Sequence, residues 1–182
     1  MTRPLYVRPW RVDLTVRDGI VAPVSGALLA RFLAATLTEA GAPRPASIGL
    51  ILSDDGELAQ LNAAHLGKTG PTDVLSFPLL SPDAFPAHPG SAERGAGIAL
   101  EFALPPGRRP HLGDIVISVE RAIEQAETGR GGQTGDRRWS PADELCLLTI
   151  HGALHICGWD HAEPVEEAAM RRVEERLLRP SR

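Results

Sequence analysis

The chain has 182 residues, with 19 lysines and arginines against 23 acidic residues, a formal net charge of −4. This length predicts one domain, or at most two small ones. With 43% hydrophobic and 23% charged residues, the composition excludes a disordered chain. The acidic balance disfavours a protein that binds bulk polyanions through a basic surface, although it leaves room for a local anion site.

The chain carries no signal for a membrane or for secretion. No apolar run approaches the ~20 residues of a membrane-spanning helix, and the first residues lack the apolar core of a signal peptide. Cys146 and Cys157 are eleven positions apart in one expected helix, about 16 Å by the helical rise, which is too far for a disulfide. We therefore expect a cytoplasmic protein with reduced cysteines and no membrane contact.

The first half of the chain alternates expected strands and helices. Apolar residues at every second position predict strands over residues 12–16 and 48–52, and a short apolar run predicts a third over 74–79. A serine N-cap opens an expected helix over 25–41, and an Asp N-cap with a Gly stop delimits another over 54–67. This order is typical of an α/β arrangement.

The second half begins with a change of composition. Residues 81–110 are rich in Pro, Gly and Ala without a sustained period, which predicts a surface insertion. A fourth strand is expected over 112–117 and a helix over 118–128. A Gly-rich loop with several arginines follows, over 128–139.

The next helix is the most informative segment. Ser140, Pro141 and Asp143 combine an N-cap, a first-turn proline and a capping acid, and apolar residues then cover nearly every face up to Gly158. Such a helix is buried all round. A last amphipathic helix begins near Pro164. The predicted fold class is α/β (of the α+β type): a single domain over 1–182, with a small four-stranded mixed sheet packed around the buried helix and about five helices.

Three histidines lie around the end of the buried helix. His151 and His155 are four positions apart, so their side chains lie one above the other on the helix. Gly158 ends the helix and allows His161 to return toward the same point. A lone buried histidine is more often a hydrogen-bonded core residue, but three converging imidazoles predict an open site for one zinc ion per chain. Asp160 is either a carboxylate that orients an imidazole or a solvated turn residue.

The spacing H-x-x-x-H-x-x-G-x-x-H is shared with the metzincin peptidases. Those enzymes need a glutamate directly after the first histidine as the general base. This chain has Gly152 at that position, and glycine cannot accept a proton. A metallopeptidase is therefore disfavoured, and another metal-assisted hydrolase is favoured.

Three segments together resemble one known family. HGALHICGWDH at 151–161, GPTDVLSFP at 70–78 and LGDIVIS at 112–118 resemble, in the same order, motifs of the YbeY family of bacterial endoribonucleases and rRNA maturation factors. The resemblance extends over nearly the whole chain. It implies a single α/β domain.

The resemblance also implies a function. It implies a zinc ion held by His151, His155 and His161, and single-strand-specific cleavage of RNA in 16S rRNA maturation and ribosome quality control. The implied partners are single-stranded or ribosomal RNA and the ribosome or its small-subunit proteins.

One position departs from the family pattern. Leu66 stands where the family usually carries an arginine tied to function, which predicts a lowered activity because leucine cannot stabilise charge on a phosphate. Lys68 is retained and is the candidate substitute, as is an arginine of the 128–139 loop. Lys68 and Asp160 are the candidate catalytic residues. The alternative is a non-catalytic ribosome-associated factor with a structural zinc ion, and a metallopeptidase is the third choice.

Overall fold

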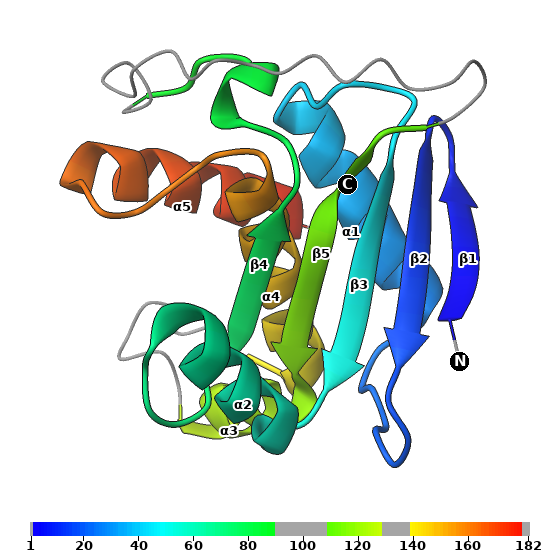
Figure 1. The fold of residues 1–182 in the computed structure, drawn as a ribbon, viewed down its shortest axis with the longest axis vertical. Coiled ribbons are helices and arrows are strands. Elements are labelled where there is room, and N and C mark those ends of the chain that lie inside the picture. Colours follow the sequence, from blue (N-terminus) through cyan, green and yellow to red (C-terminus); the bar gives the residue numbers. More distant parts are fainter. Residues whose placement is uncertain (1, 90–108, 129–138, 180–182) are drawn as a thin grey trace.

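A mixed sheet of five strands crosses the described part of the computed structural model, which comprises residues 2–89, 109–128 and 139–179. The sheet order is β1-β2-β3-β5-β4 (Figure 1). β2, β3 and β5 are parallel, whereas β1 and β4 run antiparallel at the two edges. The strands are β1 (Thr2–Val7), β2 (Trp10–Val16), β3 (Ser47–Ser53), β4 (Val74–Pro78) and β5 (His111–Ser118).

The prediction of four strands was wrong, because it missed β1. This strand pairs with β2 from Thr2 opposite Thr15 to Val7 opposite Trp10. All six of its residues are exposed or only partly buried, since it forms one edge of the sheet. An edge strand facing solvent does not need the alternation of apolar and polar residues that reveals a half-buried strand. The mixed α/β class itself is as predicted.

Five α-helices occur among the described residues, in agreement with the predicted number. They are α1 (Gly26–Glu39), α2 (Asp55–Leu66), α3 (Val119–Thr128), α4 (Pro141–Ile156) and α5 (Pro164–Leu178). None of the helices in this part of the chain combines the length and the apolar character needed to cross a membrane.

The helix ends follow the capping signals of the sequence. The Ser25 and Asp54 side chains accept hydrogen bonds from backbone N–H groups of α1 and α2. Ser140 and Asp143 form a reciprocal capping box at the start of α4. α2 ends at Gly67, whose φ of 64° is left-handed. These local contacts set where each helix begins or ends.

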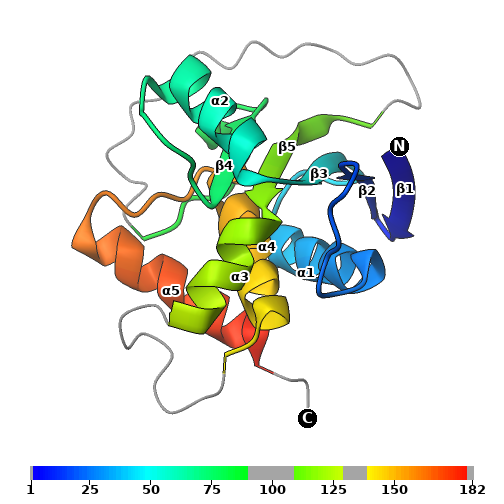
Figure 2. The ribbon, with the colours of Figure 1, turned by 90° about the horizontal axis from the view of Figure 1, so that it is seen from below.

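The helices cover the two faces of the sheet unequally. α1 and α4 lie against one face, and α2 lies on the opposite side (Figure 2). The alternation along β5 matches this arrangement, because Ile115 and Ile117 belong to the main core whereas Val116 packs with Leu58 and Leu75 beneath α2. α4 therefore has sheet on one side and helices on the others.

α4 is buried on nearly all sides, as its sequence predicts. α3 and α5 lie beside it in Figure 2. Its buried residues are Glu144, Leu145, Cys146, Leu148, Thr149, Ile150, Gly152, Ala153, Leu154 and Ile156. Cys146 and Cys157 are both buried and free, as expected.

Most of the predicted insertion at 81–110 lies outside the described residues, which omit 90–108. Its described beginning contains one 3₁₀ turn, Pro82–Ala84. His88 then stacks on Trp159 after the end of α4, with ring centroids 4.2 Å apart. The arginines of the 128–139 loop also lie outside the described residues, which omit 129–138.

Candidate metal centre and cleft

The end of α4 places two imidazoles side by side. His151 and His155 are one helical turn apart, and their Nε2 atoms lie 3.0 Å from each other. The capping box and the burial of α4 fix the direction of this helix, and therefore the direction in which both rings point. The predicted pairing of these two residues on one face is observed.

The chain reverses directly after α4 and returns a third imidazole. Gly158 has a φ of 82°, a left-handed conformation that favours glycine. The ring of His161 then lies 5.4 Å from that of His151 and 5.1 Å from that of His155, between centroids. The ligand nitrogens of the three residues all lie within 4.8 Å of one another. The three histidines thus form a group able to hold a metal ion.

The chemistry of these donors fits a transition-metal ion. Burial, followed by the neighbouring His151 and His161, lowers the pKa of His155 from 6.5 to about 4. His155 is therefore neutral at neutral pH, and neutral imidazole is the form that coordinates metals. His161 is exposed, so the group remains open to solvent on one side. Three nitrogen donors with an open side are typical of catalytic zinc sites.

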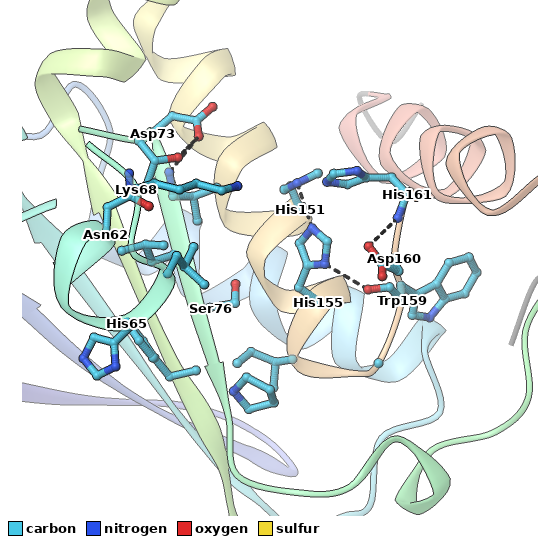
Figure 3. Close-up of a pocket in the computed structure, with 18 of the residues that line it drawn as sticks. Asn62, His65, Lys68, Asp73, Ser76, His151, His155, Trp159, Asp160 and His161 are labelled. Atoms are coloured by element: carbon cyan, nitrogen blue, oxygen red, sulfur yellow. Dashed lines mark hydrogen bonds between the residues drawn. The ribbon is translucent and has the colours of Figure 1, made fainter. Parts of the chain in front are cut away.

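The histidine group lies in the wall of a cleft of about 940 Å³ (Figure 3). The opposite wall consists of the end of α2, the loop that follows it and β4. The histidine wall comes from α4 and the turn after it. Segments about ninety residues apart in sequence therefore face each other across this cleft.

Lys68 is the one lysine or arginine among the described residues that line this cleft. Its side chain extends from the far wall toward His151 (Figure 3). Leu66, the last residue of α2, also lines the cleft and is 56% exposed. Within the described ranges, the structure thus places one cation opposite the histidines, with the apolar side chain of Leu66 on the same wall as this cation.

Hydrogen bonds hold the loop that carries Lys68 in its middle and at its end. Asn62 Nδ2, in α2, donates to the carbonyl of Gly70 in the middle of the loop at 2.8 Å. At its end, the Asp73 carboxylate accepts from the backbone N–H of Val74 at 2.9 Å and from Gln125 Nε2 at 3.1 Å. These hydrogen bonds hold the loop against α2 and α3, so that the lysine is presented from an ordered wall.

Asp160 lines the same cleft, beside His161. Its carboxylate accepts a hydrogen bond from the backbone N–H of His161 at 2.8 Å. That hydrogen bond shapes the turn after α4. The negative charge of Asp160 raises the pKa of His155, and it is the smallest of the effects that act on this pKa. A catalytic role of Asp160, like that of Lys68, stays a prediction.

Gly152, next to His151, faces the sheet. A Cβ added there would lie 2.7 Å from Ile115 Cγ2, and the Gly152 carbonyl accepts from Ser76 Oγ at 3.0 Å. α4 therefore packs so closely on β4 and β5 that a larger side chain at this position would overpack the contact. Packing thus adds to the chemical argument against a peptidase.

Two contacts that orient the imidazoles were not foreseen from sequence. His151 Nδ1 lies 2.8 Å from Glu174 Oε1, and His155 Nδ1 lies 2.9 Å from the carbonyl of Trp159. Glu174 is in α5, 23 residues after His151. No fixed spacing links them, because their contact depends on how α5 crosses α4.

Comparisons of the sequence with known proteins agree on one family. The family model described as Endoribonuclease YbeY matches residues 22–182. A protein of Roseiflexus sp. (strain RS-1) named Endoribonuclease YbeY is 36% identical over 92% of this chain and 91% of its own length. A protein of Salinispora tropica with the same name is 41% identical over 78% of each chain. A solution structure from Thermotoga maritima aligns with a TM-score of 0.48 and 21% identity, covering 91% of this chain and 86% of its own. The chain belongs to the YbeY endoribonuclease family.

Proposed function

We propose that this protein is a zinc-dependent endoribonuclease that hydrolyses phosphodiester bonds in single-stranded RNA. The observation that carries the proposal is the group of His151, His155 and His161, open to solvent in the wall of a large cleft. Family membership supports RNA as the substrate, since the matching relatives are named endoribonucleases.

The three histidines would hold one zinc ion through their ring nitrogens. When bound, zinc supplies a Lewis acid and lowers the pKa of a coordinated water toward ~7. The neutral His155 ring is ready to coordinate without first losing a proton. The histidines thus place the hydrolytic chemistry at one wall of the cleft.

Lys68 supports the same reaction from the opposite wall. A phosphate in the cleft would lie between the histidine group and the lysine ammonium (Figure 3). The ammonium can bind a nonbridging oxygen and offset the negative charge that develops there. Lysine does so as a point charge, without the two parallel hydrogen bonds of an arginine. We therefore expect a functional but slow enzyme.

The biological role that we propose follows from the family. The substrate would be 16S ribosomal RNA, cleaved during its maturation and in ribosome quality control, with the ribosome or its small-subunit proteins as partners. We propose the cytoplasm as its compartment. The acidic net charge fits local recognition in the cleft better than a broad basic surface.

The proposal is tested by metal content and cleavage together. His155→Ala should lose both the bound zinc and the cleavage of single-stranded RNA. His65→Ala, which removes another imidazole lining the cleft, should keep its zinc. Double-stranded RNA and an unstructured protein serve as alternative substrates. RNA cleavage that survives loss of the metal would refute the zinc mechanism. A zinc-loaded protein inert on every substrate would refute the nuclease and favour a ribosome-binding factor.

A further inference from the structure

In two of the three histidines, His151 and His155, the ring nitrogen Nδ1 points away from the cluster and makes a hydrogen bond. The carbonyl of Trp159 can only accept, so His155 Nδ1 carries the proton of their 2.9 Å hydrogen bond. An ionised carboxylate also only accepts, so His151 Nδ1 donates to Glu174 Oε1 at 2.8 Å. Both rings are therefore held with a proton on Nδ1.

This choice of tautomer has a direct consequence inside the cluster. Each ring, when neutral, then presents the lone pair of its Nε2 atom to the other ring, and the two Nε2 atoms lie only 3.0 Å apart. Two lone pairs cannot hydrogen-bond to each other, so a cation that both atoms bind, a proton or a metal ion, stabilises this arrangement. With the proton on Nδ1, both Nε2 atoms face the position that a metal ion would take.

The position of Glu174 is set by the packing of α5 on α4. Met170 and Val173 pack with Ile150 and Leu154 in a small apolar cluster between the two helices. Glu174 follows Val173, and its side chain is only 12% exposed. A carboxylate with so little exposure is costly without a hydrogen-bond partner, and His151 provides one. Because Glu174 contacts Nδ1, it lies on the far side of the ring from the cluster.

We propose that Glu174 is a positioning residue that fixes the tautomer and orientation of the His151 ring for metal binding. The inference rests on the proposed metal site. It gives α5 a role in metal binding, although this helix contributes no ligand to the histidine group. Partners of this kind strengthen a ligand and restrict its rotation, and their loss typically weakens metal affinity by about 10–100-fold.

Zinc affinity is the first measurement, by competition with a chromogenic chelator. Glu174→Ala should bind zinc about tenfold or more weakly than the wild type. Glu174→Gln keeps an acceptor oxygen and should recover part of the loss. Glu175→Ala is the matched control, since it removes the same charge from an exposed neighbour on the same helix and should leave the affinity within about twofold of wild type.

A second measurement separates positioning from a merely structural role. Long-range ¹H–¹⁵N spectra of the metal-free proteins should show His151 with its proton on Nδ1 in the wild type and in Glu175→Ala. In Glu174→Ala this preference should be lost. Thermal melting of the metal-free variants checks that each remains folded.

The outcomes distinguish the two proposals. A wild-type protein that binds no zinc would overturn the proposed metal site and, with it, this role of Glu174. A wild type that binds zinc no more tightly than folded Glu174→Ala would overturn the role alone. An unchanged His151 tautomer in Glu174→Ala would also overturn it.

Discussion

Replacement of Gly152 by alanine tests the close packing of α4 on the sheet. The new Cβ would lie 2.7 Å from Ile115 Cγ2 and 3.2 Å from Ser76 Oγ and Val74 Cγ2. Overpacking of this kind costs about 1–3 kcal/mol, and we expect the upper part of this range because contacts to three side chains tighten together. Alanine regains about 1 kcal/mol of helix propensity. The net loss in the free energy of unfolding should be about 1–2 kcal/mol.

The assay is thermal and urea unfolding of the metal-free protein. A loss of this size should lower the melting temperature by about 4 °C in a chain of this length. Ile115→Leu moves the branch that Gly152→Ala would meet, and alone should cost less than about 1.5 kcal/mol. In the double variant the two changes should couple favourably, by about 1 kcal/mol. A Gly152→Ala protein as stable as the wild type, with no coupling to Ile115→Leu, would refute the close approach.

Three further predictions concern charge and activity. The Arg17 guanidinium donates a hydrogen bond to Glu57 at 2.7 Å, and this bond is the main cause that lowers the pKa of Glu57 below 4.5. The pair therefore stabilises the fold above pH 4.5, and this stabilisation is lost as the pH falls through the lowered pKa. The stability gap between the wild type and Glu57→Gln in urea should therefore be larger at pH 7 than at pH 3, and an equal gap would contradict the assignment. Burial raises the pKa of Cys146 to about 11 and that of Cys157 to about 12, so a thiol reagent at pH 8 should label neither thiol in the native protein and both after denaturation. Rapid labelling of the native protein would show that the thiols are accessible. Leu66→Arg should raise RNA cleavage about tenfold, since a hydrogen bond to a charged group contributes about 1.5–3 kcal/mol, and unchanged kcat/KM would show that the cleft does not use a cation at this position.

The helices could be predicted because their signals are local. Ser25, Asp54 and Ser140 each cap the helix that the sequence assigns to them, since a cap needs only its own first turn. Gly67 likewise ends α2 through its own backbone conformation. β1 escaped prediction because its pairing with β2 is a contact between strands, and its exposed side chains leave no periodic trace.

The contacts of the candidate site also fall into two groups, those set by local geometry and those set by packing between distant elements. The approach of His151 and His155 follows from helical geometry, and that of His161 from the glycine turn, so both could be inferred from spacing. The approach of Lys68 to this group depends on how β4 and α4 pack side by side. Glu174 depends on the crossing of α5 over α4. Contacts of this second kind require the assembled fold.

The division of the cleft between distant segments has a consequence for the timing of activity. Translation completes the lysine-bearing wall early, whereas His161 and Glu174 are added only after α4. A nascent or prematurely released chain that stops before His161 contains Lys68 but only part of the histidine group. Under the proposed mechanism, which needs all three histidines, hydrolysis can therefore begin only after residue 161 has been synthesised.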